Sequence, residues 1–101
     1  MVALFGIEFA PEALLELQRL RATDQRKVID AVEKQLAHEP EKLTRRRKQL
    51  VGISPPWEQV RPVWQLRVGD FRVFYDVDSE AQLVMIRSVR RKGRQSTEDI
   101  L

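Results

Sequence analysis

Side chains able to bind phosphate groups are concentrated in the second half of the sequence. Arg67 and Arg72 flank the turn pair Gly69-Asp70, and a planar guanidinium can meet two phosphate oxygens at once. Further bases stand in two clusters, one before and one after this pair: Arg45, Arg46, Arg47 and Lys48, then Arg90, Arg91, Lys92 and Arg94. The pattern predicts an anion-binding surface, and the alternative is a solvated basic surface with no ligand.

The distribution of charge supports an anionic partner for the second half of the chain. The 101 residues carry a net charge of +3. Residues 1–41 hold eight acids and five bases, whereas residues 42–101 hold seven acids and thirteen bases. Such an asymmetry is typical of proteins that bind nucleic acid or an acidic peptide.

Composition excludes several other classes of protein. The chain has no cysteine and one histidine, which excludes disulfides, thiolate zinc sites and cysteine nucleophiles. We expect no metal and no cofactor, a single domain over residues 1–101, and a cytoplasmic location. No apolar run approaches about 18 residues, so we expect no membrane-spanning helix.

The chemistry that a cationic surface could perform on RNA is attack of a 2′-hydroxyl on its own phosphate. This reaction needs cations around the phosphorane, a base and an acid. The cations are present, but a base is not evident. His38 stands at an expected helix end, just before Pro40, and Tyr75 falls on the expected core face of a strand.

Hydrophobic periodicity predicts the elements that must position these residues. Alternation over Leu4–Phe9 indicates a strand, and three- and four-residue spacing over Pro11–Arg21 indicates a helix. A second helix, capped by Thr23, should end near His38. Glu41–Gln59 is expected to be irregular. Three strands and a short C-terminal helix should follow, at Val63–Val68, Phe71–Asp78, Leu83–Val89 and from Ser96.

The order of elements predicts an α+β fold: an N-terminal strand, a helical hairpin, then a three-stranded antiparallel meander with the helices packed on one sheet face. The opposite face should be open to water. It would carry a group of polar and charged residues from neighbouring strands: Gln65, Arg67, Arg72, Arg90 and Lys92.

The segment from Trp64 to Val77, WQLRVGDFRVFYDV, is similar to the strand–turn–strand motif of the RelE/ParE toxin superfamily. Phe9-Ala10-Pro11-Glu12-Ala13 resembles the family's first strand and helix. The runs from Thr44 to Leu50 and from Val89 to Lys92 resemble its two basic segments. The resemblance covers nearly the whole chain and implies a RelE-like fold.

The resemblance also implies a function and partners. RelE-like members are toxins of type II toxin–antitoxin systems that cut messenger RNA in the ribosomal A site, whereas ParE-like members inhibit DNA gyrase. Both are neutralised by an antitoxin whose acidic C-terminal segment covers the basic face. By this likeness, Arg67, Arg72 and Lys92 are the expected catalytic residues, and the remaining bases of the two clusters bind RNA.

The sequence departs from RelE at several catalytic positions. Val63 and Gln65 stand where RelE carries lysines, Lys92 replaces an arginine, and Glu98 falls near the place of a C-terminal tyrosine. Two alternatives to a ribosome-dependent nuclease therefore stay open. One is a non-enzymatic toxin that inhibits gyrase or only binds its antitoxin, and the other is a general nucleic-acid binder.

Overall fold

The computed structural model describes residues 4–57, 61–93 and 100. The predicted Ser96 helix start lies outside these residues. Two helices and five strands follow each other along the chain: β1 (Gly6–Phe9), α1 (Pro11–Gln18), α2 (Ala22–Leu36), β2 (Arg47–Leu50), β3 (Val63–Val68), β4 (Phe71–Asp78) and β5 (Leu83–Arg91). The predicted α+β fold is confirmed.

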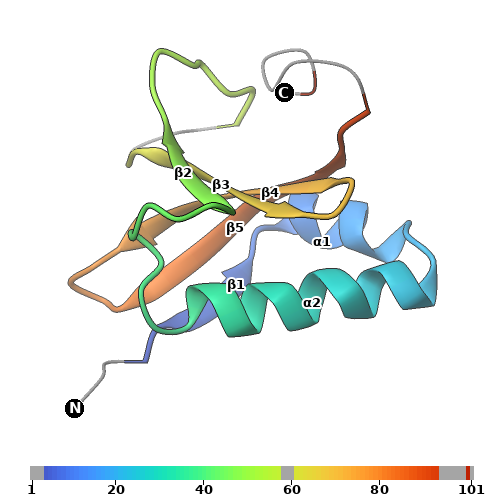
Figure 1. Ribbon diagram of the computed structural model, residues 1–101, viewed down its shortest axis with the longest axis horizontal. Coiled ribbons are helices and arrows are strands. Elements are labelled where there is room, and N and C mark those ends of the chain that lie inside the picture. The colour runs from blue at the N-terminus through green and yellow to red at the C-terminus, as the bar shows by residue number, and fades with distance from the viewer. Residues whose placement is uncertain (1–3, 58–60, 94–99, 101) are drawn as a thin grey trace.

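The strands form one mixed sheet in the order β1-β5-β4-β3-β2. The β2–β3, β3–β4 and β4–β5 pairs are antiparallel, whereas β1 lies parallel to β5 at the opposite edge from β2. Both helices lie on the same side of this sheet (Figure 1). The other face is therefore left for the loop that follows β2 and for the functional side chains.

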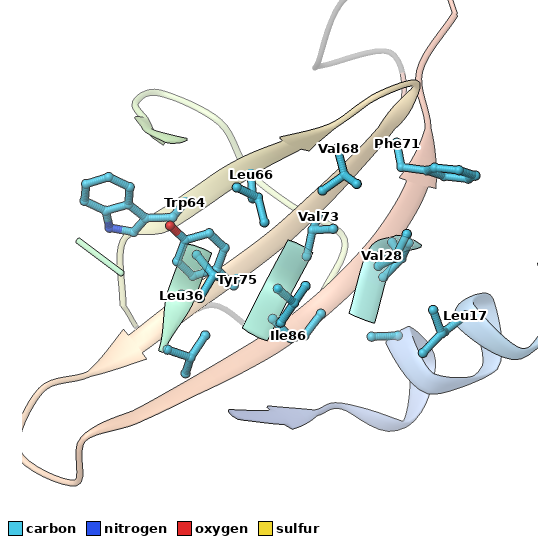
Figure 2. Packing of buried hydrophobic residues seen from close by; sticks show 14 of the residues in the cluster. Leu17, Val28, Leu36, Trp64, Leu66, Val68, Phe71, Val73, Tyr75 and Ile86 are labelled. Carbon is cyan, nitrogen blue, oxygen red and sulfur yellow. The ribbon is translucent and has the colours of Figure 1, made fainter. Parts of the chain in front are cut away.

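The main core lies between the helices and the sheet. Val28, Val32 and Leu36 recur every four residues on α2, which places them on one face of the helix, and all three are buried. Figure 2 shows Val28 and Leu36 facing the core side chains of β3 and β4. From the sheet, the alternate residues of β3 and β4 point into this core, as the sequence predicts: Trp64, Leu66, Val68, Phe71, Val73, Tyr75 and Val77.

The boundaries of the N-terminal elements differ from the sequence-based expectation. β1 begins at Gly6 and α1 ends at Gln18, so both are shorter than predicted. The expected Thr23 cap is wrong, because α2 already begins at Ala22. Its N-cap residue is Arg21, which makes no side-chain capping bond. The backbone of Arg21 is extended, with ψ of 153°, and Asp24 places an acidic side chain in the first turn.

The segment expected to be irregular contains the edge strand β2. Arg47 lies opposite Leu66 and Leu50 opposite Val63, so this short strand extends the predicted meander by one strand. Alternation of apolar residues does not reveal it, because the sequence Arg47-Lys48-Gln49-Leu50 contains a single apolar residue. An edge strand of four residues needs little apolar surface to pair with a longer neighbour.

The face opposite the helices is only partly open to water. Val63, Phe74 and Ile100 are buried there in a second apolar cluster, with Leu50 and Trp57 packed against it. Trp57 lies with its ring centroid 5.9 Å from that of Phe74. This cover corrects the prediction of a fully water-facing surface: Gln65 is 5% exposed.

No helix in the described ranges is long and apolar enough to cross a membrane.

Candidate nucleic-acid interface

Arg67 and Arg72 are direct partners across the β3–β4 hairpin. The register pairs Val68 with Phe71 and Arg67 with Arg72, one step from the turn at Gly69-Asp70. Since side chains alternate between the two faces of a sheet, both arginines share the face opposite the main core. The turn is tight because Gly69 adopts φ of +56°, a conformation that glycine reaches without strain.

A recess of about 250 Å³ gathers most of the predicted phosphate-binding residues around this pair. We call it the basic recess. Seven of its eight lining residues are cations, contributed by β2 and the loop before it, by the β3–β4 hairpin, and by the end of β5: Arg45, Arg46, Arg47, Lys48, Gln65, Arg67, Arg72 and Lys92. Such a concentration of like charge is costly without a counter-ion, which favours an anionic ligand.

Backbone carbonyls of the turn orient the guanidinium of Arg72. Its Nη1 donates to the carbonyl oxygens of Gly69 and Phe71, both at 2.9 Å. Burial and then the positive charge of Arg67 lower the pKa of Arg72, while the Asp70 carboxylate opposes this shift. Among the described residues, the Nε and Nη2 donors of Arg72 make no hydrogen bond, so they are available for an anion.

Most of the cationic side chains around Arg72 also lack protein partners among the described residues. Arg67 and Lys48 are exposed, and Lys92 is half-buried at the end of the hairpin, where its backbone N–H donates to the Asp70 carbonyl at 2.7 Å. In the part of the chain that the structure describes, no side-chain hydrogen bond or ion pair is made by Arg45, Arg46, Lys48, Arg67 or Lys92. They are available to neutralise a ligand.

Arg47 differs from its neighbours because its side chain is buried. Its Nη1 donates to the carbonyl oxygen of Gln35 at 2.9 Å and to that of Glu39. These carbonyls belong to the last turn of α2 and to the chain just after it, where helix geometry leaves carbonyls without partners. Arg47 thus joins β2 to the end of α2, and its Nη1 group is already occupied by these two carbonyls.

Two of the remaining predicted bases, Arg90 and Arg91, do not line the recess. Arg90 donates through Nε to Ser88 at 2.8 Å and through Nη1 to the Ile100 carbonyl at 2.5 Å, and it pairs with Glu16 at 3.5 Å. Arg91 lies over the Phe71 ring, 4.6 Å from its centroid, and pairs with Asp24 of α2 at 3.6 Å. Arg94 lies outside the described residues, as does Glu98.

None of the eight lining residues is an Asp, Glu, His or Tyr. Tyr75 is fully buried on the core side, where its hydroxyl donates to the Pro40 carbonyl at 2.6 Å. Burial raises its pKa far above the ordinary value of a phenol. The recess can therefore bind and polarise a phosphate, but its lining among the described residues includes no carboxylate, imidazole or phenol.

A larger hollow adjoins the basic recess, and sequence reasoning missed it. We call it the α2 groove: it has a volume of about 710 Å³ and lies between α2 and the β3–β4 turn. Lys27, Asp30 and Lys34 line it from the helix, while Arg67 and Arg72 line it from the hairpin. The three helical residues are spaced at i, i+3 and i+7, a pattern that could have indicated one polar face.

Three solved structures with a similar fold are a toxin and two complexes of toxins with antitoxins. The RelBE2 toxin–antitoxin complex from Mycobacterium tuberculosis matches with a TM-score of 0.71 and 22% identity, over 91% of this chain and 95% of that chain. The RelE–RelB complex from Pyrococcus horikoshii OT3 matches with a TM-score of 0.68 and 19% identity, over 90% and 98%. The isolated Escherichia coli RelE toxin gives 0.50 and 18%, over 94% and 92%. The fold is therefore RelE-like.

The sequence comparison places the chain in a family. Residues 7–96 match the family described as ParE toxin of type II toxin–antitoxin system, parDE. The match spans most of the 101 residues, so the chain belongs to this toxin family. No curated protein matches the sequence.

Proposed function

We propose that this toxin binds the backbone of ribosome-bound messenger RNA in the basic recess and cleaves it there. The observation that carries the proposal is the recess itself, in which five further cations line the space around the Arg67–Arg72 pair. A solvated basic surface would spread its charges, whereas here they converge on a volume of about 250 Å³. The likeness to RelE-type toxins agrees with this function.

The reaction we propose uses the RNA's own nucleophile. The 2′-hydroxyl oxygen attacks the adjacent phosphorus, the bond to the 5′ oxygen breaks, and the products are a 2′,3′-cyclic phosphate and a 5′-hydroxyl. The attacking oxygen loses its proton to solvent or to the phosphate, and the leaving oxygen gains one from solvent. Arg72, held by two turn carbonyls, would stabilise the added negative charge of the phosphorane.

Cleavage in a translation extract tests this proposal. Wild-type protein should cut a reporter transcript only when ribosomes are present. Arg72→Ala should reduce the rate about a hundredfold, because a charge-assisted contact to a transition state is lost. Arg26→Ala is a matched control, since Arg26 is exposed on α2 and lines neither hollow. Transcripts that stay whole at saturating wild-type protein would refute the nuclease.

Inhibition of DNA gyrase is the second candidate function. It is favoured by the composition of the recess, whose lining includes no side chain suited to proton transfer at neutral pH. A supercoiling assay with purified gyrase separates the two functions. Inhibition of supercoiling without cleavage of RNA would establish the second candidate, and cleavage without inhibition would eliminate it.

We also propose a cognate antitoxin with an acidic C-terminal segment as the partner of this chain. The solved complexes pair RelE-type toxins with RelB proteins. An acidic segment would neutralise the cations of the basic recess on binding. Expression of the toxin alone should arrest growth, and the product of an adjacent gene should restore it. A harmless protein that binds no such product would contradict both candidate functions.

A further inference from the structure

The α2 groove shares three cationic residues with the basic recess. Arg46, Arg67 and Arg72 line both hollows, so the two adjoin along the Arg67–Arg72 pair. A phosphate held between these arginines would have the recess on one side and the groove on the other. A polynucleotide that occupies the recess would extend into the groove without leaving the protein surface.

Two lysines provide the groove with its own positive charge. Lys27 and Lys34 lie two helical turns apart on the exposed side of α2, and both line the groove. A Cβ on Gly69 would lie 2.8 Å from Nζ of Lys27, so the ammonium of Lys27 sits directly against the β3–β4 turn. The lysine therefore brings charge from the helix to the hairpin that carries Arg67 and Arg72.

The groove also contains groups that could read a base. Asp30 stands between the two lysines along α2, and Gln35 directly follows Lys34. Both residues line the groove. A carboxylate only accepts hydrogen bonds, whereas an amide donates and accepts them. Cytosine, adenine and guanine all carry an amino group that can donate to Asp30. Uracil has no amino group and offers only its ring N3–H as a base-edge donor, so it should be the least favoured base.

We propose that the α2 groove is the subsite for the nucleotide adjoining the phosphate that the basic recess holds, with Lys27 and Lys34 neutralising the flanking backbone and Asp30 selecting against uracil. This inference rests on the proposed function for the choice of RNA as ligand. The volume of about 710 Å³ falls within the range of about 300–1,000 Å³ that small-ligand sites occupy.

The composition of the groove favours a nucleotide over an acidic peptide. Asp30 and Asp70 both line it, and they would repel the carboxylates of an antitoxin segment. A base edge with an amino group gains from the same carboxylate. The basic recess, in contrast, has no acidic residue in its lining, so an acidic peptide should bind there instead.

The salt dependence of RNA binding tests the role of the lysines. Affinity for a fluorescent cytidine hexamer would be measured from 50 to 200 mM salt, with no ribosome present. For single strands, each neutralised phosphate contributes about 0.7 to the slope of log K against log salt. The K27Q/K34Q double variant should therefore lower the slope by about 1.4. The R26Q/K42Q variant, which removes two charges outside both hollows, should leave the slope unchanged.

Base selection is tested with the same assay. Wild-type protein should bind the cytidine hexamer more tightly than a uridine hexamer, and Asp30→Ala should abolish this difference. Equal slopes for wild type and K27Q/K34Q, or no binding of either hexamer by wild type at 50 mM salt, would overturn the subsite. If the double variant instead weakened only the binding of an acidic antitoxin peptide, the groove would be a peptide site and the inference would be wrong.

The outcome is separable from that of the proposed function. Hexamer binding that depends on Lys27 and Lys34, in a protein that never cleaves transcripts, would refute the nuclease and retain the subsite. Cleavage that needs Arg72 but is accompanied by unchanged slopes in K27Q/K34Q would retain the nuclease and refute the subsite.

Discussion

Arg67 and Arg72 face each other across β3 and β4 as a pair of like charges. They are register partners one step from a two-residue turn. Like charges directly opposite each other in a sheet destabilise it, and both arginines lie on the sheet face opposite the helices. The hydrogen bonds from Arg72 to the Gly69 and Phe71 carbonyls partly offset the repulsion. The arrangement costs stability in the free protein, and an anion held between the two guanidiniums would relieve this cost.

Replacing one member of the pair should therefore stabilise the protein. Arg67→Gln keeps a long polar side chain but removes the repulsion, and we expect the free energy of unfolding to rise by about 0.2–1 kcal/mol at low salt. Urea denaturation at 10 mM and 500 mM salt measures it. The gain should shrink at high salt, because screening weakens the repulsion between exposed charges. A loss of stability at low salt would contradict the like-charge interpretation.

Arg47 and Lys48 are neighbours in one basic run, yet their replacement should have opposite consequences. Arg47→Ala leaves the Gln35 and Glu39 carbonyls without their charged donor, so we expect a loss of about 2 kcal/mol in the free energy of unfolding. Lys48→Ala should change stability little, because that side chain is exposed. Lys48→Ala should weaken RNA binding instead. Equal losses of stability in the two variants would contradict this division of roles.

Tyr75→Phe tests whether the buried phenol is structural. The hydroxyl group donates to the Pro40 carbonyl at 2.6 Å, and its removal should cost about 1 kcal/mol of stability. The toxin should retain its full activity, because Tyr75 does not line the basic recess. Growth arrest on expression, compared with Arg72→Ala, measures activity. Loss of toxicity in a stably folded Tyr75→Phe protein would place the hydroxyl in the mechanism.

Burial of the Tyr75 phenol should also affect how the stability of the protein depends on pH. Burial raises the pKa of Tyr75 above its ordinary value of 10.0, so above about pH 10 the folded protein binds more protons at this group than the unfolded chain does. Stability contributed by this group is fully present below pH 10 and falls as pH rises further. Tyr75 is the only tyrosine, so absorbance at tyrosinate wavelengths follows it alone. Ionisation in the native state near pH 10 would contradict the burial.

The buried carboxylate of Asp76 should make Arg87 indispensable to stability. The two side chains are 2.7 Å apart, and Asp76 is 2% exposed. Arg87→Ala would leave this charge buried without its partner, at a cost of about 3 kcal/mol. Denaturation of the D76N/R87A double variant is the comparison, since it removes the stranded charge. The double variant should be more stable than Arg87→Ala alone, and the reverse order would refute the assignment.

Much of the fold follows from hydrophobic periodicity. β3 and β4 begin and end where alternation predicts, because both have one face in the main core and so leave a period-two signal in the sequence. The parallel pairing of β1 with β5 does not follow from it, since pairing partners are set by packing over 70 residues of separation. β2 escapes detection because an edge strand with a single apolar residue carries almost no signal.

The candidate site was only partly predictable for a related reason. Strand parity places Arg67 and Arg72 on one face, and this follows from sequence alone. The different roles of the residues in Arg45–Lys48 cannot be predicted from sequence. Nothing in the run distinguishes Arg47, whose role depends on where α2 ends in space. Arg90 and Arg91 likewise pair with Glu16 and Asp24, acids more than 60 residues away in the sequence.

Because they flank the tight turn at Gly69-Asp70, the two arginines also affect the register in which β3 and β4 pair. If β4 slid past β3 by one position, every side chain of the slipped strand would change face, and a guanidinium would be carried beneath the helices. An unpaired ion in that apolar layer is among the most unfavourable arrangements a protein can adopt. Hairpins with a shifted register are therefore strongly disfavoured. The two arginines that line the basic recess thus also help to specify the register of β3 and β4.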